Sequence, residues 1–131
     1  MGKIVKFKFL KIDAKISEDL IGEVSINNHV SIKELKQDEN VLELIFEYSS
    51  KYSKDNKDLA IITFGGLIGY SDEKAKIDGY VKDWAKDKKL PKEAMSPMLN
   101  FVLTKCNIES LKVSQVLNLP SPIPLPEVKV Q

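Results

Sequence analysis

Two residues could support nucleophilic catalysis, namely His29 and Cys106, each the only residue of its kind in the sequence. A cysteine nucleophile needs a histidine beside it in space, and usually a third group that orients the imidazole ring. The sequence indicates no such third group. Cys106 falls on the apolar stripe of an expected helix, and His29 falls in an expected polar turn, "INNHVS". A buried apolar thiol and a solvated imidazole are the ordinary states at such positions, so the sequence predicts no enzyme and no catalytic residue.

Metal and cofactor sites have as little support in the sequence. Zinc sites use three or four Cys or His ligands at short spacings, and this chain has two such residues, far apart. The acidic residues stand singly or alternate with lysines, so no oxygen-rich calcium loop is indicated. The glycine-containing stretch "FGGLIG" lacks the residue spacings of both dinucleotide-binding and nucleotide-binding loops. We therefore expect no metal and no cofactor.

Composition narrows the possible partners. The net charge is +1, and all 20 basic residues are lysine, without one arginine. Arginine is the usual means of a bidentate grip on phosphate or guanine, so nucleic acid is not an expected partner. The longest uncharged run is too short to cross a bilayer, and the lysine-rich start does not resemble a signal peptide. The single cysteine suits a reducing compartment, and we expect a cytoplasmic protein without membrane insertion.

The first half of the chain predicts strands. In "KIVKFKFLKIDAKI", Val5, Phe7 and Phe9 should share one face of a strand. After Phe9 the apolar residues move from odd-numbered to even-numbered positions, which predicts a bulge. We expect an irregular connection over residues 17–28, a strand near residues 30–36 and a polar turn at residues 37–40.

The next two apolar segments are the clearest strands. "VLELIFEYSSKY" alternates apolar and polar residues, as in an antiparallel strand with one exposed face. "LAIITFGGLIGY" has apolar residues at both odd-numbered and even-numbered positions, which predicts a strand covered on both faces. Gly65 and Gly66 within this segment predict either a bulge or a close approach of two backbones.

The second half predicts two helices. Ser71 or Asp72 should cap the first helix, whose apolar stripe comprises Ile77, Tyr80, Val81 and Trp84. Pro91 can open a second helix, whose broad apolar stripe extends past Asn107, where a break is possible. The order of elements predicts an α+β fold, a four-stranded antiparallel sheet followed by two helices. We expect a single domain over residues 1–131, with the sheet in residues 1–70, the helices in 71–119 and a proline-punctuated segment in 120–131.

The C-terminal segment places proline at every second position, at Pro120, Pro122, Pro124 and Pro126. This spacing contains no PxxP motif, so it does not predict recognition of the SH3 type. The favoured interpretation is a strap that packs its aliphatic residues, such as Ile123, onto its own domain. Packing on a neighbouring subunit and lining a site for a client polypeptide are the alternatives.

The element order, together with three short motifs, resembles the SecB-like export chaperones. The motifs are Gly65-Gly66-Leu67-Ile68 in the last strand, Pro91 and Pro97 around the start of the second helix, and "LNLPSPIPLP" after it. The metal-binding C-terminal tail of bacterial members has no counterpart here. The resemblance implies a homo-oligomer, a dimer or tetramer, that holds unfolded chains in apolar grooves between helix and sheet. SecB-like proteins also act as dedicated chaperones of toxin–antitoxin pairs.

The leading hypothesis is therefore an ATP-independent binding protein or chaperone for unfolded or non-native polypeptide. Exposed apolar and aromatic surface would be needed for this function. The alternative is a non-catalytic structural or adaptor subunit with one specific protein partner. The candidate client-binding residues are Phe7, Phe9, Phe46, Tyr48, Tyr52, Leu67, Ile68 and Trp84.

Overall fold

The computed structural model describes residues 2–20 and 22–120, and within them four strands are followed by two helices. The neighbour order in the sheet is β1-β4-β3-β2, and every pair is antiparallel. This arrangement confirms the predicted α+β fold. The elements are β1 (Lys3–Ile16), β2 (Ser25–Asp38), β3 (Val41–Lys54), β4 (Lys57–Ser71), α1 (Lys74–Asp87) and α2 (Lys92–Val116).

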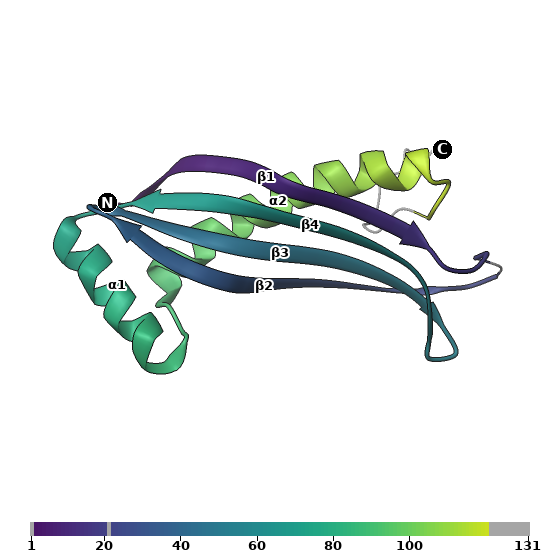
Figure 1. Ribbon diagram of the computed structural model, residues 1–131, viewed down its shortest axis with the longest axis horizontal. Helices are drawn as coiled ribbons and strands as arrows, with labels where there is room; N and C mark the ends of the chain where they lie inside the picture. Colours follow the sequence, from purple (N-terminus) through teal and green to yellow (C-terminus); the bar gives the residue numbers. More distant parts are fainter. Residues whose placement is uncertain (1, 21, 121–131) are drawn as a thin grey trace, which may run out of the picture.

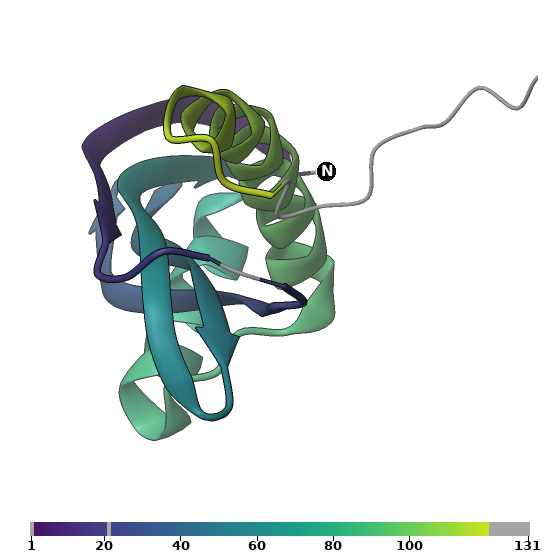
Figure 2. The same ribbon diagram turned by 90° about the vertical axis from the view of Figure 1, so that its right-hand side faces the viewer.

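The long strands form a curved sheet, and α2 runs along one face of it, which we call the inner face (Figures 1 and 2). Helix α1 lies at one end of the sheet, beside β2 and β3. The core lies between α2 and the inner faces of β3 and β4. Its largest fully buried side chains include Phe46, Tyr48, Tyr52, Phe64, Ile68, Met98, Val102 and Cys106.

The alternation predicted for β3 is confirmed, because its even-numbered residues from Leu42 to Tyr52 are all buried, whereas the odd-numbered ones are partly or fully exposed. Asp55 and Asn56 join β3 to β4 with φ values of 53° and 64°. Both residue types tolerate this left-handed conformation, which suits a tight hairpin turn. The double-sided coverage predicted for β4 is confirmed only near its end, where Leu67 on the outer face is 8% exposed; Ile61, Thr63 and Gly65 on the same face are partly exposed.

Gly66 lies where two backbones and a ring meet. A Cβ atom there would stand 2.5 Å from Cζ of Phe46 and 2.7 Å from the carbonyl oxygen of Lys8, so the predicted close approach is confirmed. The predicted bulge in β1 is also confirmed, since the register with β4 shifts between Phe9 and Lys11. A second shift between Ile4 and Lys6 was not expected. It places Val5 outside the ladder and 47% exposed, so the prediction that Val5 shares a face with Phe7 is wrong.

Strand β2 is longer than the sequence predicts. It begins at Ser25 and continues to Asp38, so the polar stretch around His29 is strand rather than turn, and the next turn is confined to residues 39–40. Pairing with β3 overrides the weak strand preference of Asn27 and Asn28. The Ser50 hydroxyl donates to Oδ1 of Asn28 over 2.7 Å, which gives one of these amides a partner in the neighbouring strand.

The helix boundaries also differ from the sequence prediction. Ser71 ends β4, and Glu73 is the N-cap of α1 without a side-chain cap, so the predicted cap is wrong. The Asp72 carboxylate instead accepts a hydrogen bond from the Glu73 N–H over 2.8 Å. Helix α2 runs unbroken through Asn107, so the possible break there is also wrong. Neither helix in the described ranges is long and apolar enough to cross a membrane.

Candidate functional site

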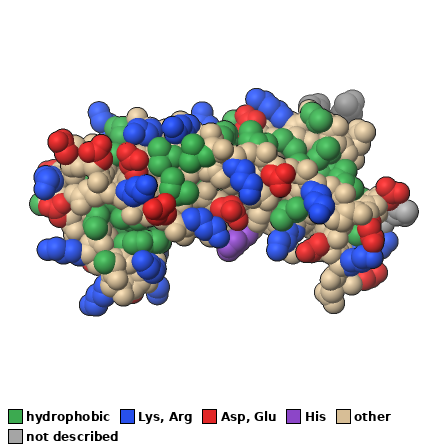
Figure 3. All heavy atoms as spheres, in the orientation of Figure 1, with side chains coloured by type: hydrophobic (Ala, Val, Ile, Leu, Met, Phe, Trp, Pro, Cys, Tyr) green, Lys and Arg blue, Asp and Glu red, His purple; other side chains and the backbone are tan. Residues whose placement is uncertain are grey.

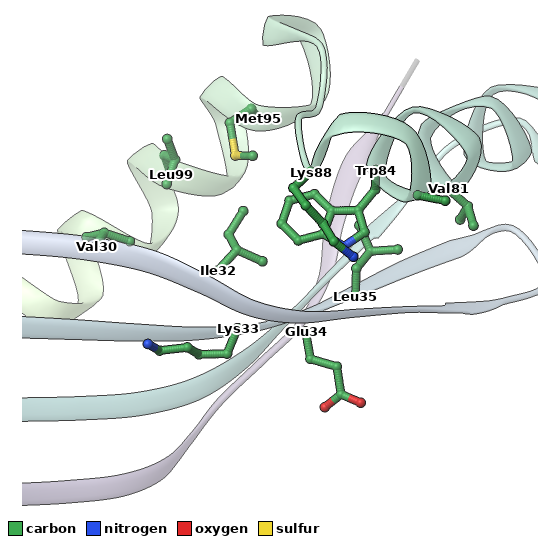
Figure 4. Close-up of a pocket in the computed structure, with 11 residues that line it drawn as sticks. Val30, Ile32, Lys33, Glu34, Leu35, Val81, Trp84, Lys88, Met95 and Leu99 are labelled. Carbon is green, nitrogen blue, oxygen red and sulfur yellow. The ribbon is translucent and has the colours of Figure 1, made fainter.

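An apolar groove lies between β2, α1 and the first turns of α2, with a volume of about 830 Å³ (Figure 4). We call it the β2 groove. Most of its lining side chains are aliphatic or aromatic and only half-buried. The lining residues are Val30, Ile32, Lys33, Glu34, Leu35, Val81, Trp84, Ala85, Lys88, Met95 and Leu99.

Strand β2 forms the floor of the groove through Val30, Ile32 and Leu35. Val30 and Ile32 have even numbers and Leu35 an odd one, so in a regular strand Leu35 would point to the opposite face of the sheet. The register with β3 shifts between Ile32 and Glu34, and this irregularity returns Leu35 to the inner face. Figure 4 shows Ile32 and Leu35 pointing into the groove, and Lys33 and Glu34 pointing away from it.

The two helices form the walls. Val81 and Trp84 of α1 face Met95 and Leu99 of α2 across the groove (Figure 4). The Lys88 ammonium lies 5.6 Å from the ring centroid of Trp84, within the range of a cation–π contact. The groove therefore offers an apolar surface with one aromatic ring and one cation at its rim.

Two hydrogen bonds hold the walls in place. The Gln37 amide donates to Oδ1 of Asp78 over 2.6 Å and joins β2 to α1. This hydrogen bond is the main cause that lowers the pKa of the Asp78 carboxyl. The Tyr80 hydroxyl donates to Oε1 of Glu93 over 2.9 Å and joins α1 to α2. Burial, followed by the nearby Glu93 carboxylate, raises the pKa of Tyr80, which therefore keeps its donor proton. Both bonds therefore join elements that border the groove.

Half of the eight residues predicted to bind clients belong to the core instead. Phe46, Tyr48, Tyr52 and Ile68 are at most 2% exposed, so folding itself consumes their surface. The Tyr48 hydroxyl is held by Ser50 and Asn107, at 3.2 and 3.5 Å.

The remaining predicted residues lie in three places. Phe7 and Phe9 are partly buried at the β1 edge, and the Phe7 ring stacks on Phe46 with centroids 5.6 Å apart. Leu67 lies on the outer face, opposite the helices. Of the eight predicted residues, only Trp84 lines the β2 groove.

Sequence reasoning did not assign Val30, Ile32, Leu35, Met95 or Leu99 to a site. One signal was present in α2, where Met95 and Leu99 form a second apolar row beside the buried row of Ala94 and Met98. Two adjacent rows make a helix face wider than one contact with a sheet covers. The β2 residues carried no such signal. The register shift after Ile32 places Leu35 on the same face as Ile32, and the alternation in the sequence does not show this.

The one possible nucleophilic pair is not assembled. Cys106 is fully buried in the core, and burial raises the pKa of its thiol to about 12. His29 pairs with Ser49 on the outer face of the sheet, on the other side of the sheet from Cys106. Among residues 2–20 and 22–120, no three His, Cys, Asp or Glu side chains lie close enough together to hold a metal ion.

Comparison with solved structures shows that the chain has a SecB-like fold. The chain matches the SecB-like chaperone Rv1957 of Mycobacterium tuberculosis, in complex with a ChAD peptide from the antitoxin HigA1 (Rv1956), with a TM-score of 0.63. The sequences are 11% identical, and the match covers 99% of this chain and 92% of that chain. No family model matches the sequence, and no curated protein does. The predicted SecB-like fold is thus confirmed as a fold.

Proposed function

We propose that this protein is an ATP-independent chaperone of the cytoplasm that holds non-native polypeptide segments in the β2 groove. The single observation that carries the proposal is a groove whose apolar residues are only half-buried in a chain that otherwise fills its core. A fold that leaves Trp84, Met95 and Leu99 partly in water retains apolar surface for a partner. The SecB-like fold gives independent support, since the matched protein is a chaperone that binds a peptide.

The shape of the groove suits an extended segment rather than a folded domain. Its floor is the edge strand β2, which is paired on one side only within the described residues. An extended chain can add its backbone to such an edge while alternate side chains enter the apolar space. Non-native polypeptide supplies both an unpaired backbone and exposed apolar side chains.

A homo-oligomer, either a dimer or a tetramer, is part of the proposal. Apolar residues also stand exposed at the other edge of the sheet, on β1, and on the outer face, where they alternate with lysine and acidic side chains (Figure 3). Exposed apolar side chains on an unpaired edge strand favour association with a second copy. On β1 these residues are Val5, Leu10, Ile12 and Ile16, all more than 40% exposed.

The test is suppression of aggregation of a reduced, chemically unfolded model protein by stoichiometric amounts of this protein. We expect suppression by the natural protein and a strong loss in Leu99→Asp, because an apolar client would have to bury the new carboxylate without a partner. Ile108→Asp is the matched control, since Ile108 lies on the same helix, is 48% exposed and does not line the groove. No suppression by the folded natural protein would contradict the proposal.

A second candidate is a dedicated adaptor with one specific protein partner. The matched chaperone is seen with a peptide from one antitoxin, which favours a narrow choice of partner. This candidate predicts one co-purifying protein that protects the groove, and no effect on the aggregation of the unrelated model protein.

A further inference from the structure

We propose that the β2 groove selects non-native segments that carry an Asp or Glu side chain among their apolar residues, and that Lys88 recognises this carboxylate. This choice of client rests on the chaperone function proposed above. Three features of the groove support it, namely its charges, the backbone conformation of Lys88 and the position of the Lys88 ammonium. The predicted C-terminal strap lies outside the described residues beyond Pro120, and it is not the occupant proposed here.

Among the described residues, three charged side chains line the groove, and only Lys88 extends toward its floor. Lys33 and Glu34 point away from the groove (Figure 4). Both of these charges are already matched on the outward side. Lys33 pairs with Glu47 at 4.0 Å, and Glu34 pairs with Lys36 at 3.9 Å. The side of the groove that faces a client therefore carries a positive charge.

Lys88 has no acidic partner within residues 2–20 and 22–120. None of the ion pairs between described residues includes it. The neighbouring Asp87 carboxylate instead accepts a hydrogen bond from the N–H of Lys89 over 3.2 Å. The Lys88 ammonium lies 5.6 Å from the ring centroid of Trp84. Because an ammonium group has three donors and a ring face offers no carboxylate, Lys88 can still bind an acidic group of a client.

The backbone of Lys88 adds a second observation. Lys88 is the C-cap of α1, with φ of 58° and ψ of 33°, and its N–H donates to the carbonyl oxygen of Trp84 over 2.9 Å. Glycine is the usual residue in this left-handed conformation, because a Cβ atom makes it unfavourable. A cation also suits the C-terminal end of a helix, but Lys86 and Lys89 supply that charge without lining the groove. An unfavourable conformation beside an open site is therefore better explained by binding than by folding.

The position of the ammonium suits an acidic side chain within a segment rather than the end of a chain. Val30 and Val81 lie toward opposite ends of the groove, and Lys88 lies between them (Figure 4). An extended segment that passes over the floor has residues on both sides of this point. A side-chain carboxylate can thus reach Lys88 while its apolar neighbours stay in contact with the floor.

The floor indicates the spacing expected in the client. Val30, Ile32 and Leu35 pair with three successive inner-face residues of β3, so they stand about 7 Å apart along the strand. A segment added to the edge of β2 presents alternate residues at the same spacing. The Lys88 ammonium lies at the level of Leu35 along β2 in Figure 4. We therefore expect two apolar residues and one acidic residue at alternate positions, with the acidic residue nearest Leu35.

The test uses a peptide blocked at both ends, Ser-Leu-Ser-Val-Ser-Glu-Ser, and its analogues with Gln or Lys in place of Glu. Blocked ends leave that side chain as the only site of charge. Titration followed by the fluorescence of Trp84, the one tryptophan of the sequence, reports occupancy of the groove. For the natural protein we expect the Glu peptide to bind about fivefold more tightly than the Gln peptide, as for a partly exposed ion pair. The Lys peptide should bind most weakly, and high salt should reduce these differences.

Charge reversal identifies the residue that recognises the carboxylate. Lys88→Glu should invert the order, so that the Lys peptide binds most tightly and the Glu peptide most weakly. Lys89→Glu is the matched control, because it makes the same change of charge at the same end of α1 and does not line the groove. We expect it to keep the natural order. An unchanged order in Lys88→Glu would overturn the proposal.

Lys88→Gly separates recognition from folding. It removes the ammonium group and suits the φ of 58°, so we expect a higher melting temperature together with equal binding of the Glu and Gln peptides. If a well-folded Lys88→Gly protein retains the preference for the Glu peptide, Lys88 does not recognise the carboxylate.

Failure of this selectivity differs from failure of the chaperone function. Equal binding of the three peptides to the natural protein, abolished by Leu99→Asp, would overturn recognition by Lys88 and leave the groove as a polypeptide site. No binding of any peptide to the folded natural protein would count against both proposals.

Discussion

Strands β3 and β2 present apolar side chains to the same inner face, yet the structure uses them differently. On β3, Leu42, Leu44 and Phe46 are at most 2% exposed, because β3 lies inside the sheet, between β4 and β2, and its inner face belongs to the core. On β2, Val30 and Ile32 are half-buried, because β2 is the edge strand and the helices leave the groove open beside it. The neighbours of a strand, rather than its own pattern, therefore decide whether its apolar side chains stabilise the fold or remain available to a partner.

The largest effect that this difference predicts is on stability. Phe46→Ala should lower the free energy of unfolding by about 3–5 kcal/mol, because it removes a buried ring and leaves a cavity. Ile32→Ala should cost about 1 kcal/mol, because part of this side chain is already in water. Urea unfolding of both variants measures the difference, and equal costs would remove the distinction between core and groove.

A second pair of variants tests the close packing around Gly66 on the inner face of the sheet. Gly66→Ala should destabilise the protein by roughly 1–3 kcal/mol, because its Cβ would overlap with the Phe46 ring and the Lys8 carbonyl oxygen. Gly79→Ala is the matched control in α1, where a Cβ meets nothing within 4 Å. There we expect a gain of about 0.5–1 kcal/mol from helix propensity, measured by thermal unfolding. Two changes of the same sign would contradict the packing described for Gly66.

A smaller effect concerns Tyr52, which links the core to the end of the described chain. Burial and the neighbouring Tyr48 raise the pKa of Tyr52 to about 12, from 10.0. The fold thus favours the neutral phenol, and its contribution is complete below pH 10 and decreases as the pH rises from 10 through 12. Tyr52→Phe should cost about 1 kcal/mol at neutral pH, through the lost hydrogen bond to Pro120, and should flatten the alkaline decline. Stability measured from about pH 8 to about pH 12 checks this, and an unchanged slope in the variant would contradict it.

The sequence predicted the architecture well because the governing patterns are local. The alternation in β3 and the 3.6-residue period in α1 depend on neighbouring residues, and so does the change of parity after Phe9. The close approach at Gly66 was predictable for the same reason, since a glycine inside an apolar strand commonly marks a bulge or a place where a second backbone comes near.

The candidate site was predicted less well, because it depends on which elements become neighbours. Aromatic residues such as Tyr48 were assigned to a binding surface, although the fold uses them in its core. The floor of the groove was missed because an irregularity at Lys33 changes the parity between Ile32 and Leu35. Such an irregularity arises in the pairing with β3, and no pattern within β2 alone reveals it.

The most direct test of the central claim is a methyl NMR titration with a reduced, unfolded model polypeptide. If the β2 groove holds non-native polypeptide, the methyl signals of Val30, Ile32 and Leu99 will shift with one common affinity. Those of Ile108 and Val116, which are exposed on α2 and do not line the groove, will remain in place. Shifts confined to these two exposed residues, or no shifts at saturating polypeptide, would contradict the account.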